Sequence, residues 1–75
     1  SEKELFEVSI NLQDAVLFIS SNPELIGEIL KIKDIQGRVM AELPINKTNE
    51  YIPLEHLNSG LYFVEIRQIL KQFWR

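Results

Sequence analysis

The chain has 75 residues, no cysteine and a net charge of −3 at pH 7. Its length predicts one small domain over residues 1–75, with a single core. The absence of cysteine excludes disulfides and thiolate metal sites, and the acidic balance argues against a nucleic-acid-binding surface. No apolar run is long enough for a transmembrane segment, and the first residues, SEKELFEV, lack the basic and apolar regions of a signal peptide.

The first part of the chain begins with two predicted strands. ELFEVSI places Phe6 and Val8 on one face, and DAVLFIS alternates in the same way. The segment that follows, NPELIGEILKI, offers Asn22 as a cap and Pro23 at a first helical position, but Gly27 and the β-branched residues weaken a helix there. We therefore expect at most a single helical turn between the second and third strands.

The clearest predicted hairpin lies around DIQGRVM. Leu30 and Ile32 share a face of the strand before it, and Gly37 is a turn residue that adopts positive φ without a steric penalty. Asp34 is expected to accept backbone N–H groups in this turn. Arg38 lies on the exposed phase, where we expect it to pair with Asp34 or with a carboxylate on a neighbouring strand.

Three further strands are predicted in EYIPL, GLYFVEIR and ILKQFW. Pro53 places EYIPL at the edge of a sheet, because proline lacks the N–H that an inner strand donates. In the corner EHLNSG, Leu57 is expected to fill the core and Gly60 to turn the chain, and Tyr62 then faces the core. About seven short strands with regular turns predict an all-β fold, a small antiparallel β-sandwich.

The final segment, ILKQFWR, carries apolar residues on both phases. One phase is expected to complete the core. The other is expected to leave a sheet edge bearing Lys71 and Arg75, where a partner could add backbone hydrogen bonds or an acidic contact. Lys71, Trp74 and Arg75 are therefore candidate recognition residues.

Residues suited to catalysis or metal binding are sparse. His56 is the one histidine, and we expect it to be a solvated turn residue; a weak ligand or a pH-sensitive contact is the alternative. Asp14, Asp34 and the glutamates lie singly, without metal-ligand spacing, and the glycines form no phosphate-binding run. The sequence therefore predicts no enzyme, no metal and no cofactor.

Aromatic residues fall in several predicted strands, namely Tyr51, Tyr62, Phe63 and Trp74. Tyr62 shares its phase with other apolar residues and is assigned to the core. Tyr51 and Phe63 are expected to face outward, where they leave a modest apolar patch. We interpret these residues as packing against the core or a partner, and a carbohydrate-binding platform is the alternative.

Three stretches in fixed order, LKIKDIQGRVM, EYIPLEHLNSGLYFVEI and the basic-aromatic end KQFWR, resemble the C-terminal sorting domain of the type IX secretion system of Bacteroidota. The family pattern combines I-x-D-x-x-G-R-x-V with I-x-L-x-x-L-x-x-G-I-Y-F-V-x-I and covers nearly the whole chain. The residues that fall on it are Ile32, Asp34, Gly37, Arg38, Ile52, Leu54, Leu57, Gly60, Leu61, Tyr62, Phe63, Val64 and Ile66.

The chain departs from the family in one place. Members commonly carry a Y-P-N-P stretch before the first long strand, and the matching positions here, 9–12, read S-I-N-L, so that only Asn11 is kept. Without the two prolines, Ile10 and Leu12 are expected to extend the first strand.

The resemblance implies an Ig-like sandwich that serves as a passive export signal of a secreted protein. The implied partners are the outer-membrane secretion machinery, an upstream cargo domain and a sortase-like peptidase that cuts the domain off. The implied location is the periplasm in transit, then the cell surface or the extracellular space. The alternative function is an accessory Ig-like, carbohydrate-binding or spacer sandwich of a secreted Bacteroidota protein.

Overall fold

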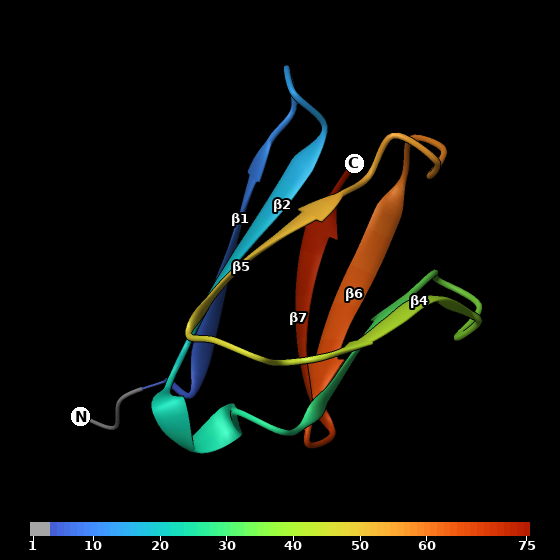
Figure 1. Ribbon diagram of the computed structural model, residues 1–75. Coiled ribbons are helices and arrows are strands. Elements are labelled where there is room, and N and C mark those ends of the chain that lie inside the picture. Colours follow the sequence, from blue (N-terminus) through green and yellow to red (C-terminus); the bar gives the residue numbers. More distant parts are fainter. Residues whose placement is uncertain (1–3) are drawn as a thin grey trace.

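The computed structural model describes residues 4–75, so residues 1–3 of the predicted domain lie outside the described residues. Seven strands form two antiparallel sheets that face each other (Figure 1). The first sheet has the order β1-β2-β5, and the second has the order β4-β3-β6-β7. The strands are β1 (Phe6–Asn11), β2 (Val16–Ser21), β3 (Ile29–Lys33), β4 (Val39–Pro44), β5 (Asn49–Pro53), β6 (Leu61–Ile66) and β7 (Ile69–Trp74). The predicted all-β sandwich is confirmed.

The core lies between the sheets and follows the period-two pattern of the sequence. In β6 the alternate residues Tyr62, Val64 and Ile66 are buried, and in β3 Leu30 and Ile32 are fully buried. The other buried residues are Phe6, Leu17, Ile19, Leu25, Ile45, Ile52, Leu54, Leu57 and Phe73. Because apolar residues recur at every second position, each strand has one core face, and the two core faces bury each other.

A single turn of 3-10 helix, η1 (Pro23–Leu25), connects β2 to β3 across the end of the sandwich (Figure 1). The Asn22 side chain caps it by accepting a hydrogen bond from the backbone N–H of Glu24 at 3.0 Å, and Pro23 occupies the first position. Leu25 points into the core and is fully buried. The expectation of at most a single helical turn here is confirmed.

Prolines lie on two of the four edge strands. Pro53 ends β5 and Pro44 ends β4, both at the outer edge of their sheets. A proline there removes an N–H that would otherwise point to solvent. The assignment of Pro53 to a sheet edge is confirmed.

The first strand is shorter than predicted, and the expectation that Leu12 extends it is wrong. β1 ends at Asn11, and Leu12 lies in the following turn with 61% of its surface exposed. Asn11 closes this turn: its amide donates to the Asp14 carboxylate at 3.1 Å and its Oδ1 accepts from the Asp14 N–H at 3.1 Å. The turn is completed by Ala15 at φ 54°. Within residues 4–75 no helix is long and apolar enough to span a membrane.

Candidate functional site

The turn between β3 and β4 projects from the sandwich and is organised by one side chain, Asp34 (Figure 1). Its Oδ1 accepts hydrogen bonds from the backbone N–H groups of Gln36 and Arg38, each at 2.9 Å. Backbone bonds close the same turn, because Gly37 N donates to Asp34 O and Asp34 N donates to Arg38 O, each at 3.0 Å. The predicted role of Asp34 as an acceptor within the turn is confirmed.

The same carboxylate fixes the side chain of Arg38. Arg38 Nε donates to Asp34 Oδ2 at 2.7 Å, so that the expected pairing of these two residues is confirmed. The Arg38 side chain remains 71% exposed, whereas that of Asp34 is only 11% exposed. Desolvation acts to raise the pKa of Asp34, but hydrogen bonds from the Arg38 backbone, its guanidinium and the Gln36 backbone outweigh it and hold that pKa below its ordinary value. The tip of the hairpin therefore presents the Arg38 cation to solvent, in a position that its hydrogen bond to Asp34 fixes.

Glycine is required in this turn by its backbone conformation. Gly37 has φ +84°, and a Cβ built there would meet nothing within 4 Å. The space around it is open, so only the dihedral angle favours glycine. Gly60, the other motif glycine, has φ +153°, also with open space around it. Both predicted turn glycines lie at positive φ.

The corner between β5 and β6 lies beside the hairpin and is held by Tyr62. Its hydroxyl donates to the Asn58 carbonyl at 2.7 Å, and its ring stacks on Phe73 of β7 with centroids 5.7 Å apart. Leu57 is buried in the core below this corner, as expected. A single aromatic side chain thus ties the corner to β7, which explains why a tyrosine and not a phenylalanine occupies this core position.

The hairpin tip and the corner border a hollow of about 300 Å³, whose lining includes Arg38, Met40 and Leu61. Leu61 is also the register partner of Trp74 on β7. Two of the large apolar side chains here are exposed: Ile35, in the lining of the hollow, by 70%, and Trp74, next to Leu61, by 62%. We call Ile35, Arg38, Met40, Leu61 and Trp74 the recognition surface, as the candidate surface for contact with a partner. Ile35 and Arg38 come from the β3–β4 turn, Met40 from β4, Leu61 from β6 and Trp74 from β7, so the surface combines one cation with four apolar side chains.

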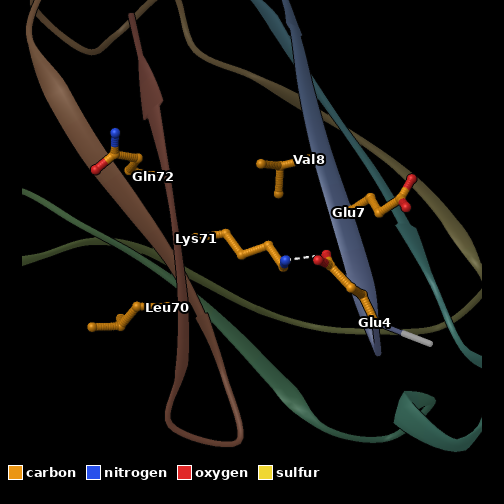
Figure 2. A pocket seen from close by; sticks show the side chains of 6 residues that line it. All are labelled: Glu4, Glu7, Val8, Leu70, Lys71 and Gln72. Atoms are coloured by element: carbon orange, nitrogen blue, oxygen red, sulfur yellow. Dashed lines mark hydrogen bonds and ion pairs between the residues drawn. The ribbon is translucent and has the colours of Figure 1, made fainter. Parts of the chain in front are cut away.

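The expectation that Lys71 stands free on the exposed phase of β7 is wrong. Lys71 shares the phase of Phe73, and only 26% of its side chain is exposed. Its Nζ pairs with the Glu4 carboxylate (Figure 2). The same Nζ lies 5.7 Å from the centroid of the Phe6 ring. The physical reason is the strand period, because residues two apart point to the same side. β7 itself is an edge strand, as predicted.

Arg75 is not free either. Its Nε donates to the Leu54 carbonyl at 3.0 Å, and its backbone exchanges two hydrogen bonds with Gly60 at 2.8 and 3.2 Å. Arg75 therefore continues the β6–β7 ladder by one pair beyond Trp74. Of the three tail candidates, Trp74 is the one whose side chain is largely exposed to solvent.

The four strand aromatics do not form one platform. Tyr51 lies on the first sheet, 68% exposed as expected, and packs against Phe18 with ring centroids 4.9 Å apart. Phe63 and Trp74 lie on the second sheet, where Phe63 is half-buried. The aromatic surfaces are therefore split between different sheets.

The polar residues considered for chemistry lie apart. His56 is exposed in the corner and lines the hollow beside Arg38, whereas Asp14 lies in the β1–β2 turn. Among residues 4–75 no group of three His, Cys, Asp or Glu side chains is placed to hold a metal ion.

One ionic cluster escaped the sequence reasoning. Arg67, in the turn between β6 and β7, binds Glu28 at 3.0 Å and Glu24 at 3.1 Å. The hydrogen bond that Arg67 donates to the Glu28 carboxylate is the main contact that raises the pKa of Arg67 above its ordinary value. These partners are 39 and 43 positions away in the chain, so local periodicity gave no signal for them.

Comparison with known proteins gives one family. The model of the secretion system C-terminal sorting domain matches residues 7–73 of the 75-residue chain. No curated protein and no solved structure matches significantly. The matched region includes β2 to β6 in full, all but one residue of β1 and of β7, the turns at Gly37 and Gly60, and the buried Tyr62 corner. The chain therefore belongs to the secretion system C-terminal sorting domains, the sorting signals of proteins exported by the type IX secretion system.

Proposed function

We propose that this chain is a passive sorting domain that the secretion machinery reads through the recognition surface. Family membership implies recognition by the type IX machinery and export to the cell surface or the extracellular space. The domain itself does no chemistry in this proposal: it is a single folded unit that marks a cargo domain located upstream.

The fixed position of Arg38 is the observation that carries the proposal. Its guanidinium is held by Asp34 at 2.7 Å while most of the side chain faces solvent. A partner that binds it does not have to order a free side chain, which lowers the entropic cost of association. The recognition surface also contains the exposed Ile35 and Trp74, and arginine and tryptophan are the residue types that carry most energy in protein interfaces.

The tail contributes to recognition in two ways. Trp74 contacts the machinery with its exposed ring. Lys71 and Arg75 support that contact by fixing β7, one through Glu4 and the other through Leu54. Lys71 and Arg75 thus affect recognition indirectly, by holding the tail in place. They do not form the free basic edge that the sequence suggested.

The route follows from the type of signal. The cargo and its sorting domain pass through the periplasm, the machinery recognises the folded domain at the outer membrane, and a sortase-like peptidase then removes the domain from the cargo. A folded sandwich suits this role because its surface stays the same whatever cargo precedes it.

The test is an export assay in a type IX-competent cell with a reporter fused ahead of the domain. Arg38→Gln removes the cation and leaves the backbone bonds of the turn in place, so the variant should fold and the reporter should stay in the cell envelope. Lys47→Gln, at an exposed position in the β4–β5 connection, is the matched control and should be exported normally. Normal export of a folded Arg38→Gln variant would refute the assigned role of the hairpin.

A further inference from the structure

The guanidinium of Arg38 keeps most of its hydrogen-bonding capacity free. An arginine carries its N–H donors in a fixed planar fork, and Arg38 uses one of them, because its Nε donates to Asp34 Oδ2 at 2.7 Å. Its terminal Nη groups donate no hydrogen bond to any acceptor among residues 4–75. Since 71% of the side chain is exposed, these groups are open to a partner. The parallel donors at the end of a guanidinium match a planar acceptor with two oxygens.

The carboxylate that pairs with Arg38 is already satisfied by hydrogen bonds. The Asp34 side chain is 11% exposed, and its oxygens accept from the backbone of Gln36, from the backbone of Arg38 and from Arg38 Nε. The Asp34–Arg38 pair is neutral as a whole, so an approaching anion meets exposed donors but no excess positive charge. This favours an acceptor with one negative charge, since a phosphate would bring nearly a second charge that nothing in the pair offsets.

The hollow beside Arg38 offers room and further donors. It measures about 300 Å³ and is lined by the β3–β4 hairpin and the β5–β6 corner, which project from the same side of the sandwich (Figure 1). The corner contributes exposed side chains with N–H or O–H groups, namely His56, Asn58 and Ser59. Asp34 is the one acidic residue of this lining within the part of the chain that the structure describes. A second acceptor would therefore meet no other carboxylate in the hollow.

Apolar side chains complete the lining of the hollow. Ile35 and Met40 are exposed, and Leu61 is half-buried. A small anion alone would leave these side chains in water, whereas an apolar residue next to the charge would cover them and gain free energy. The lining therefore fits a segment in which an acidic residue stands beside apolar ones.

We propose that the hollow receives the carboxylate of an aspartate or glutamate side chain of the partner protein. Its two oxygens accept hydrogen bonds from the terminal Nη groups of Arg38, and a neighbouring apolar residue of the same segment packs on Ile35 and Met40. This inference rests on the proposed function and names the chemistry that the partner presents. The sequence placed an acidic contact at Lys71 and Arg75, but the side chains of both are engaged within the fold, whereas Arg38 retains free donors.

The probe is the tripeptide Leu-Glu-Leu, acetylated and amidated at its ends, and binding is followed by NMR of the backbone amides and of the Arg38 Nε–H group. The signals of Ile35, Arg38, Met40 and Leu61 should shift during the titration. The tripeptide Leu-Gln-Leu has nearly the same shape without the charge and should bind about tenfold more weakly, because its hydrogen bonds to the guanidinium are no longer between ions. A tripeptide with phosphoserine in place of glutamate should bind no more tightly than Leu-Glu-Leu.

Two substitutions of Arg38 separate its charge from the geometry of its donors. Arg38→Gln should weaken binding of Leu-Glu-Leu by about tenfold, and Arg38→Lys should recover only part of the loss, because lysine keeps the charge without the paired donors. Lys47→Gln removes an exposed cation elsewhere and should bind as the unchanged chain does. The backbone amide spectrum verifies that each variant folds. If an Arg38 variant unfolds, the comparison of the glutamate and glutamine peptides on the unchanged chain still tests the proposal.

Several results would overturn the proposal: no binding of Leu-Glu-Leu, equal binding of Leu-Gln-Leu, tighter binding of the phosphoserine peptide, or shifts that avoid the hairpin and the corner. An equal loss of affinity in Lys47→Gln would also overturn it, because the attraction would then come from the overall charge of the chain. These outcomes are separate from the export assay. If the two peptides bind equally while a folded Arg38→Gln domain fails to be exported, the role of Arg38 in sorting stands and the carboxylate partner is refuted.

Discussion

Lys71 and Glu4 join the last strand of the sandwich to the residues that lead into the first. The Lys71 ammonium pairs with the Glu4 carboxylate and also lies over the Phe6 ring, 5.7 Å from its centroid. β1 and β7 belong to different sheets and share no ladder. The Lys71 side chain therefore links the two sheets at a place where no backbone hydrogen bond joins these strands. It fastens the two ends of the domain together.

Lys71→Ser should therefore destabilise the domain by about 1–2 kcal/mol, the sum of a partly exposed ion pair and a cation–π contact. Urea denaturation followed by circular dichroism measures this. Lys47→Ser, at an exposed position, is the control and should change stability by less than about 0.5 kcal/mol. Equal effects of the two substitutions would show that Lys71 does not fasten the strands.

Gly37→Val should destabilise the domain by more than about 1 kcal/mol, because a β-branched residue resists φ +84° although space for its side chain is open. Gly37→Asn should cost less, because asparagine tolerates the left-handed region. Thermal melts of the two variants give this order. A Gly37→Val variant with the same melting temperature as the unchanged chain would show that position 37 does not require glycine.

Asp34 should give the domain an acid-sensitive component of stability. Its folded pKa lies below its ordinary value of about 3.9, so its contribution is fully present above that pH and is lost as the pH falls through the folded pKa. The free energy of unfolding should thus fall more steeply on acidification in the unchanged chain than in Asp34→Asn, and the two curves should converge at low pH. Urea titrations across the acid range provide the measurement, and parallel curves would contradict it.

Much of this fold could be read from the sequence, because the governing signals are local. Period-two alternation located the strands, Gly37 and Asp34 marked the hairpin, and Pro53 marked an edge. Each depends on residues within a few positions of one another, where steric and hydrogen-bonding preferences act directly.

The contacts of the tail could not be read in this way. Alternation alone places Lys71 on the side of Phe73, but only the folded chain shows Glu4, 67 positions away, at the end of its side chain. The β6–β7 turn could not be predicted from the sequence either, because Arg67 and Gln68 adopt φ 55° and 68° although neither is a glycine. The recognition surface was found only in part: Arg38 and Trp74 were noted, but the register that brings Leu61 beside Trp74 depends on strand pairing.

The β6–β7 turn offers a stabilising substitution. Two-residue hairpin turns with positive φ at both positions favour glycine at the second, where Gln68 has φ 68°. Gln68→Gly should raise the free energy of unfolding by about 0.5–1 kcal/mol, since relief of the left-handed strain exceeds the entropic cost of glycine. Gln36→Gly is the control: Gln36 is not at positive φ, so it should gain nothing. The urea midpoints of the Gln68→Gly and Gln36→Gly variants, each compared with that of the unchanged chain, test this difference.

Phe73 and Trp74 separate folding from recognition, because they are adjacent on β7 but face opposite ways. Phe73 is 4% exposed and Trp74 is 62% exposed. Phe73→Ala should cost about 3–5 kcal/mol, enough to unfold a domain of this size, and should abolish export together with the fold. Trp74→Ala should keep the fold, with a change of less than about 1 kcal/mol, and should nevertheless reduce export of a fused reporter, because it removes the exposed ring from the recognition surface. The measurement pairs a melt with the fraction of reporter that reaches the medium or the cell surface. Export of Trp74→Ala at the level of the unchanged domain would confine recognition to the hairpin, and a large loss of stability would show that the ring supports the fold as well.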